Sequence, residues 1–396
     1  MLIASLVIAA TVAAFIYLMR PSVRTNVMWG AMITPLASII GSGFLILGPV
    51  LNDKFGGYAP LIMLGLCVVS YFFGAAVRRN IVTTEWGAGR DPQRKRLDSI
   101  GGWALAFSYM ISLPYYLNVM GAFAVSLTPF DGQLYGRIVA TAAFILILLA
   151  GWLKGFDALE EMEKYSVSIK LAIIVGLLVG MAAFFVHKAS AGQLAFAPAT
   201  IGGWHAVAVC FGLVVTVQGF ETSRYLGLNY SARDRAWSMH WAQIISSVIY
   251  MIYIVLLVYA IPPDGSELTD TSVIGMMKQV SFILPPLLVL SALVAQFGGA
   301  VADTAGAGGL IEERSGGRIS ARLAYAILAI VGVILTWSAN VFELVAYASR
   351  AFAFYYGVEA LIAARNAWRG DRRHAFGFYA IAILAVLVVI FGRPAE

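Results

Sequence analysis

Long apolar stretches follow one another along the whole chain, and short segments rich in charge, glycine and proline separate them. A hydrocarbon core about 30 Å thick requires about 20 apolar residues per helix. Backbone in contact with lipid must also pair its own polar groups, as an α-helix does. The pattern therefore predicts an all-α membrane protein with about twelve transmembrane helices. The expected spans are 1–19, 28–51, 60–79, 101–127, 136–153, 165–187, 204–226, 238–261, 281–311, 321–338, 340–364 and 375–392.

Composition supports this class and excludes others. Hydrophobic residues make up 60% of the 396 positions and charged residues 12%, against about 25% charged in a soluble domain. Cys67 and Cys210 both fall inside expected spans, so neither a disulfide framework nor a metal site is expected. With no recognisable catalytic motif or basic domain, we expect no enzyme activity and no nucleic-acid partner. The expected partners are the lipid bilayer and a small-molecule substrate.

Basic residues predict the orientation. Most arginines and lysines fall in loops within 78–96, 224–235, 314–322 and 365–373, which twelve alternating spans place on one side. Loops rich in Lys and Arg face the cytoplasm, so both termini are expected outside a plasma membrane of the bacterial inner-membrane type. The first span lacks a basic region before it, which favours a retained anchor helix over a cleaved signal peptide. The opposite side keeps only Lys54, Arg137, Lys188, Lys278 and Arg393.

Two spans carry helix-breaking sequences near their middle. The first is Ile39-Ile40-Gly41-Ser42-Gly43-Phe44, and the second is Gln218-Gly219-Phe220-Glu221-Thr222-Ser223. Each glycine disfavours a helix interior by about 1 kcal/mol relative to alanine. Transporters bind their substrates where spanning helices are interrupted near the bilayer midplane. A helix-packing seam of small residues is the alternative interpretation for either motif alone.

These segments also carry a family resemblance. The run Ile39 to Leu47 resembles the helix-1 signature of the amino acid–polyamine–organocation (APC) superfamily. Gly219-Phe220-Glu221, followed by a basic loop with Asn229, Arg233 and Arg235, is similar to that superfamily's helix 6 and the loop after it. The resemblance covers about residues 28–364.

The resemblance implies a LeuT-type fold with two inverted repeats of five helices and unwound core helices 1 and 6. The core would span 28–364, with repeats 28–187 and 204–364, flanked by an extra helix with its linker at 1–27 and another at 365–396. It also implies secondary active transport by alternating access. The aromatic gate that family members often carry just before the second break has no counterpart in 212–217.

The resemblance further implies a substrate site at the two breaks. Backbone amides at Gly41, Ser42 and Gly43 would receive a substrate carboxylate, because helix N-termini favour anions. Carbonyl groups around Gly219 and Phe220 would face its ammonium group, and Glu221 would take part in proton-dependent substrate handling. The alternative for Glu221 is a structural role within the unwound segment. Tyr109 on core helix 3 is a further candidate for lining the pocket.

The coupling ion is left open between two arrangements. Asp303 and Thr304 on core helix 8 resemble the oxygen ligands that bind Na⁺ in sodium-coupled relatives, and hard oxygen donors suit small cations. Lys170 on core helix 5 resembles the lysine that fills this space in proton-coupled members. If Lys170 pairs with Asp303, H⁺ is expected as the coupling ion; if Lys170 snorkels to the interface, Na⁺ remains open. No other cofactor is expected.

Helix 10 carries two further ionisable candidates, Glu343 and Arg350, two turns apart on one face. They predict a gate, or alternatively a buried pair that holds the helix to a neighbour. The leading hypothesis is a secondary transporter, by symport or antiport, of a small amino acid or related organic solute coupled to H⁺ or Na⁺. The alternatives are an inorganic cation transporter of the same fold and a membrane sensor or scaffold that does not transport.

Overall fold

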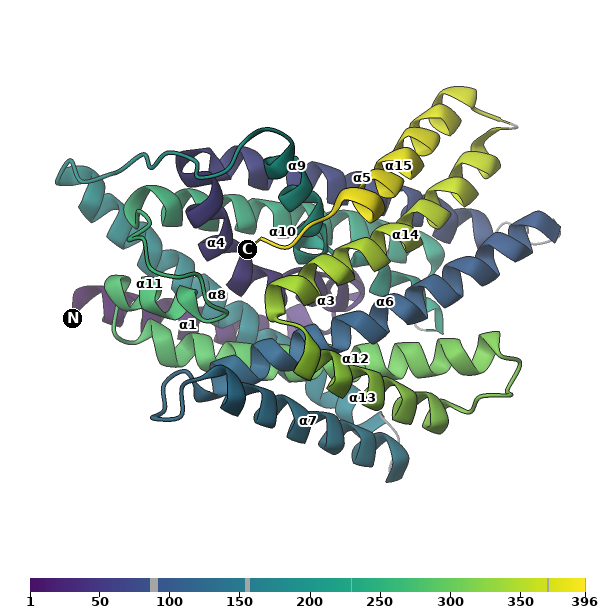
Figure 1. The fold of residues 1–396 in the computed structure, drawn as a ribbon, viewed down its shortest axis with the longest axis horizontal. Helices are drawn as coiled ribbons and strands as arrows, with labels where there is room; N and C mark the ends of the chain where they lie inside the picture. Colours follow the sequence, from purple (N-terminus) through teal and green to yellow (C-terminus); the bar gives the residue numbers. More distant parts are fainter. Residues whose placement is uncertain (86–91, 154–156, 229, 369, 396) are drawn as a thin grey trace.

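The computed structural model describes residues 1–85, 92–153, 157–228, 230–368 and 370–395. Asn229 and residues 86–91 of the first basic loop therefore lie outside the described part of the chain. The described residues form helices and turns and no strand, so the all-α prediction is confirmed. Figure 1 shows these helices packed side by side, with their axes mostly along the long direction of the molecule.

The helices before the second break correspond closely to the first six predicted spans. They are α1 (Leu2–Leu18), α2 (Pro21–Arg24), α3 (Val27–Ile39), α4 (Ser42–Phe55), η1 (Gly56–Tyr58), α5 (Ala59–Glu85), α6 (Pro92–Val125), α7 (Gln133–Leu153) and α8 (Asp157–Ser190).

The second break lies among the remaining helices. One of them, the short helix α11, was not predicted from the hydropathy pattern. They are α9 (Gly203–Gly212), η3 (Val214–Val217), η4 (Phe220–Leu228), α10 (Ala232–Ala260), α11 (Ser272–Val280), α12 (Leu284–Arg314), α13 (Ala321–Ser338), α14 (Val341–Trp368) and α15 (Arg372–Phe391).

Each predicted span coincides with one helix or with one interrupted run of helices. By length and apolar composition alone, seven stretches of the described chain are able to cross a membrane. The long helices α6 and α14 are not among them, because they carry polar side chains in their buried faces. Ser108, Ser112 and Asn118 are buried on α6, and Ser349 and Glu359 on α14. These helices are therefore shielded by their neighbours.

The packing follows from that burial. The helices α6 and α14 cross the centre of the molecule in Figure 1, and α6 packs against α12, α14 and α7. The helix α5 packs against α10 and α14. The first and last long helices lie at the periphery, with α1 against α8 and α15 against α14. The centre of the bundle is thus built from the most polar of the long helices.

Small residues allow several of these helices to approach closely. On α6, a Cβ atom added at Gly121 would overlap the carbonyl oxygen of Gly136 on α7, so the two backbones touch. On α8, Gly176 faces the Thr11 hydroxyl of α1 in the same way. Such small-residue seams are the usual means of helix association in membranes.

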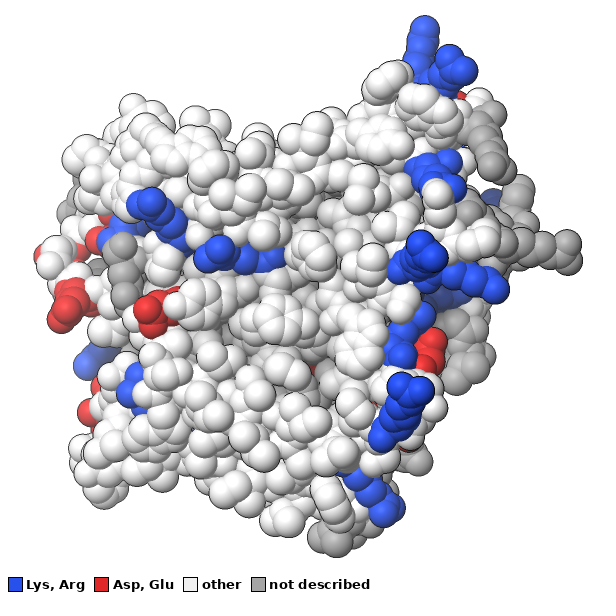
Figure 2. Space-filling model, turned by 45° about the vertical axis from the view of Figure 1, so that its right-hand side comes forward, with Lys and Arg blue, Asp and Glu red and all other residues white. Residues whose placement is uncertain are grey.

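One end of the bundle is distinctly basic. It is the end where α5 finishes, α6 begins, and α12 and α14 finish, on the right of Figure 1. In Figure 2 many of the lysine and arginine side chains gather along this right-hand end. We call it the basic end. The N-terminus lies at the opposite end in Figure 1.

Replacing Gly121 by valine is expected to destabilise the fold by about 1–3 kcal/mol, because the added side chain overpacks the contact between α6 and α7. Thermal unfolding of the purified protein measures the loss. Gly65→Val is the matched control, since nothing lies within 4 Å of a Cβ atom added at Gly65. Equal stability of the two variants would contradict the close approach.

Candidate functional site

The first predicted break lies between α3 and α4. Helix α3 ends at Ile39, Ile40 leaves helical geometry, and α4 begins at Ser42 with Gly41 as its N-cap. Helix termini leave backbone groups without partners inside the helix. The end of α3 therefore presents carbonyl oxygens at this point, and the first turn of α4 presents N–H groups, including those of Ser42 and Gly43.

The second predicted break lies between η3 and η4. Here Gln218 is extended and Gly219 has a φ of +118°, a backbone conformation that side chains rarely allow. A Cβ atom at Gly219 would also lie 2.6 Å from the backbone carbon of Ser38, at the end of α3. Glycine is required here for two reasons, because of its φ and because of this close approach.

The two breaks touch each other. A Cβ atom added at Gly43 would lie 2.6 Å from Cα of Thr216, so α4 begins directly against η3. The hydroxyl of Tyr250, on α10, lies 3.0 Å from the Ile39 carbonyl oxygen and 2.8 Å from that of Thr216. One hydroxyl group thus lies within hydrogen-bond distance of a carbonyl oxygen at the end of each interrupted helix.

Other side chains from the surrounding helices donate to three further carbonyls near the breaks, those of Ala37, Val217 and Gly212. The ammonium of Lys170 donates to the Ala37 carbonyl at 2.6 Å, and the Ser70 hydroxyl donates to Val217 at 2.7 Å. Ser349 donates to the Gly212 carbonyl at 2.7 Å and accepts from the N–H of Val215 at 2.9 Å. Lys170 is 6% exposed, so the alternative in which it snorkels to the interface is wrong.

Glu221 lies at the centre of the second break and is 2% exposed. Its Oε2 atom accepts from the N–H of Gly219 at 3.1 Å and from the hydroxyl of Tyr356, on α14, at 2.6 Å. The ring of Phe220 packs beside Tyr356 with 5.0 Å between the ring centroids. The carboxyl group is therefore held between the bend of the broken helix and α14, where a change in its charge would act on both.

The predicted ion-coupling residues on α12 lie in the interior. Asp303 accepts a hydrogen bond from the Ser112 hydroxyl on α6, and Thr304 donates to the Ala300 carbonyl of its own helix at 2.7 Å. Both residues are buried. The Asp303 carboxyl group thus binds α12 to α6, while the Thr304 hydroxyl is already used within its helix.

Tyr109 is buried where α6 meets α12 and α14. Its ring meets Phe352 edge-on at 5.9 Å between centroids, and it lies 3.3 Å from where a Cβ atom at Gly306 would be. These contacts are those of a packed aromatic residue in the wall of the bundle.

Glu343 and Arg350 are not brought together. Glu343 accepts from the N–H of Asn340 at 2.9 Å, while Asn340 accepts from the N–H of Glu343 at 2.8 Å. This is a reciprocal capping box at the start of α14. Arg350 is exposed and donates to the Val389 carbonyl of α15 at 2.7 Å. The predicted gate is wrong for this conformation, because both side chains serve helix ends and packing instead.

Sequence reasoning missed four of the side chains that shape the site: Ser70, Tyr250, Ser349 and Tyr356. Each is a hydroxyl in an otherwise apolar span, and that polarity was the only signal available. Their acceptors are distant in the chain, up to 211 residues for Tyr250 and Ile39. Spacing along one helix does not reveal such partners.

Two comparisons with known proteins bear on this arrangement. A family model described as an APC superfamily transporter matches residues 21–392. The chain is also 36% identical to an uncharacterized protein of Aquifex aeolicus (strain VF5), in an alignment that covers 99% of this chain and 97% of that protein. Both matches include the two breaks and the helices around them.

Replacing Tyr250 by phenylalanine is expected to destabilise the fold by about 1–2 kcal/mol, because two buried carbonyls lose their donor. Thermal unfolding checks this. Tyr253→Phe is the matched control: Tyr253 is equally buried on α10, and its hydroxyl meets no hydrogen-bond partner among the described residues. A loss in Tyr253→Phe as large as that in Tyr250→Phe would contradict the role assigned to Tyr250.

Proposed function

The chain belongs to the APC superfamily of transporters, and on this premise we propose that it is a secondary active transporter of a small amino acid or related organic solute. Transport is coupled to H⁺ or Na⁺ and proceeds by alternating access, as symport or antiport. The protein acts in the plasma membrane with both termini outside, so that the basic end faces the cytoplasm.

The junction of the two interrupted helices carries this proposal. The start of α4 at Gly41, Ser42 and Gly43 presents the N–H groups of a first helical turn, without a side-chain cap from Gly41, and the positive end of a helix dipole, which suit a carboxylate. The bend at Gly219 and Phe220 offers backbone oxygens and the Glu221 carboxyl group, which suit an ammonium group. Tyr109 is proposed as a wall residue. An amino acid zwitterion carries both groups, a carboxylate for the start of α4 and an ammonium group for the bend at Gly219.

The helix contacts support an arrangement of two inverted repeats of the LeuT type. Residues 28–187 and 204–364 each hold five core helices, the first of them interrupted. The contact of α6 with α7 corresponds to that of α12 with α13, and the contact of α5 with α14 corresponds to that of α10 with α8. The two outer helices also occupy corresponding positions: α1 packs on α8, the last helix of the first repeat, and α15 packs on α14, the last helix of the second.

For the coupling ion we propose H⁺ first. The Lys170 ammonium already sits at the carbonyl end of α3, where a positive charge is favoured and a sodium ion would otherwise bind. A proton exchanged at Glu221 would then be the coupled event. Na⁺ held by Asp303 and Thr304 is the second possibility for the same step.

An inorganic cation as the cargo is a second candidate function. It is favoured by one observation, the buried carboxyl group of Asp303 with the Ser112 hydroxyl beside it, since carboxylate and hydroxyl oxygens suit hard cations. The amino-acid-like substrate remains the better supported candidate, because the start of α4 is suited to an anionic group.

Thermal stability of the purified protein, measured against amino acids, amines and inorganic cations with and without sodium, tests the function. A ligand at 100 times its Kd should raise the stability by about 2.7 kcal/mol. We expect one amino acid or related solute to do so, and transport of that solute into proteoliposomes to follow. Stabilisation by inorganic cations alone would favour the second candidate, and no response to any compound would favour a sensor or scaffold.

Glu221→Gln is expected to remove most of the pH dependence of ligand binding while leaving the fold intact, because the amide oxygen still accepts from Tyr356 but the group no longer exchanges a proton. Binding measured from about pH 5 to about pH 8, a range in which tuned carboxyl groups exchange their proton, checks this. Glu343→Gln, at the capping box, should keep the wild-type profile. An unchanged profile in Glu221→Gln would return Glu221 to a structural role.

A further inference from the structure

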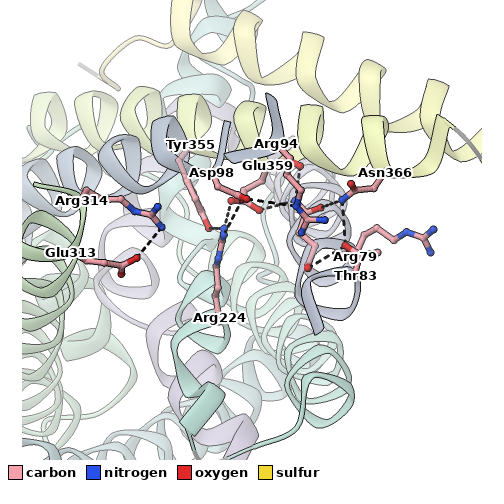
Figure 3. A network of polar contacts seen from close by, with 11 residues as sticks. Arg79, Thr83, Arg94, Asp98, Arg224, Glu313, Arg314, Tyr355, Glu359 and Asn366 are labelled. Atoms are coloured by element: carbon pink, nitrogen blue, oxygen red, sulfur yellow. Dashed lines mark hydrogen bonds and ion pairs between the residues drawn. The ribbon is translucent and has the colours of Figure 1, made fainter. Parts of the chain in front are cut away.

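Arg224 is the centre of an ion-pair network at the basic end, shown in Figure 3. One of its terminal nitrogens donates to the Glu359 carboxylate and lies 3.4 Å from the Tyr355 hydroxyl. The other lies 3.7 Å from Asp98. Arg224 belongs to η4, while Glu359 and Tyr355 belong to α14 and Asp98 to α6. A single side chain therefore joins the broken helix to two continuous ones.

Glu359 is held firmly in place to receive this arginine. Glu359 is 0% exposed, and the Asn80 amide of α5 donates both to its carboxylate and to its main-chain carbonyl, each at 2.8 Å. A buried carboxylate that lost its cationic partner would be strongly destabilised. The contact with Arg224 is thus one of those that hold η4 against α14.

The same segment is fastened to α14 at a second level. Three residues complete one turn of a 3-10 helix, so Glu221 and Arg224 lie on the same face of η4. Glu221 bonds to Tyr356, and Arg224 bonds to Tyr355 and Glu359. The carboxyl group at the candidate substrate site and the arginine at the basic end therefore move as one rigid turn.

A cavity of about 200 Å³ reaches this network. Just beyond Arg224, Ser223 is 0% exposed and Glu221 is 2% exposed. Arg224 thus lines the cavity and lies one turn of η4 away from the buried Glu221. The cavity is lined by Gly102, Arg224, Leu310, Glu313, Arg314 and Tyr355.

We propose that Arg224, Glu359 and Asp98 form a latch in which Arg224 is the positioning residue that holds η4 against α14 and closes the candidate site toward the basic end. The inference rests on the proposed function, whose alternating access it makes specific. Opening breaks the contact of Arg224 with Glu359, whose carboxylate keeps its hydrogen bond from Asn80. Arg224 keeps Asp98, which already lies 3.7 Å away and is itself 3.6 Å from Arg94. The arginine keeps an anionic partner while η4 leaves α14.

Accessibility of residue 223 tests the latch without any knowledge of the substrate. Ser223→Cys is a mild substitution, since the Ser223 hydroxyl has no hydrogen-bond partner in the described part of the chain. It is placed in a chain with Cys67→Ala and Cys210→Ala, and the rate of modification by a bulky water-soluble maleimide is measured in nanodiscs.

Neutralising both partners, Arg224→Gln with Glu359→Gln, leaves no unpaired buried charge and is the main variant. We expect the modification rate of Cys at position 223 to rise about tenfold, because the labelling of a closed site follows its opening equilibrium. Arg224→Lys should restore part of the protection. Arg314→Gln is the matched control, since Arg314 borders the same cavity but pairs with Glu313 of its own helix.

Native Cys67, buried on α5, separates local opening from general loosening. It is kept as the single cysteine in a chain with Cys210→Ala and wild-type Ser223, and its rate should stay unchanged in the double variant. An unchanged rate at position 223, or an equal rise at Cys67, overturns the latch. The proposed function fails separately, if the wild-type chain neither binds nor transports any compound of the panel.

Discussion

Two transmembrane helices stop in the middle of the bundle, and every backbone group that this exposes must find a partner away from water. The structure meets this constraint with side chains from four surrounding helices: Ser70 from α5, Lys170 from α8, Tyr250 from α10 and Ser349 from α14. Hydrogen bonds from these four helices therefore stabilise the two interruptions. The four helices that supply the donors are in turn fixed in their rotation, because each must point one polar group at the junction.

The glycines at the junction determine how near the two broken helices come. Gly43 brings the start of α4 against the backbone of Thr216, and Gly219 brings the second bend against the end of α3. The N–H groups of one break and the carbonyl groups of the other thus face one compact region. From there Glu221 and Arg224 carry the connection along one turn of η4 to α14. The proposed alternating access would act through this connection.

The spans and both breaks were predictable because they depend on local composition: about twenty apolar residues in a row, or glycine beside polar residues near the middle of such a run. The contacts that make the site were not, since Tyr250 and Ile39, or Arg224 and Glu359, are joined only by the tertiary fold. Glu343 shows a different failure. The pattern Asn340-x-x-Glu343 is a capping-box signal, and it accounts for Glu343 better than the spacing to Arg350 does. An ionisable residue at the edge of a span is better tested first against its own helix end.

The Tyr250 hydroxyl carries one hydrogen, yet two carbonyl oxygens lie within 3.0 Å of it. A single hydroxyl donates one full hydrogen bond at a time, so the carbonyl groups of Ile39 and Thr216 share one donor. If the two helix ends separate, the carbonyl that stays beside Tyr250 forms a stronger hydrogen bond. The free energy lost is then smaller than the loss of two full hydrogen bonds. If the two helix ends part in the proposed transport cycle, a shared donor lowers the free-energy cost of that step, and about 1.4 kcal/mol changes a rate tenfold. Two independent donors would hold the junction more tightly and would slow the step.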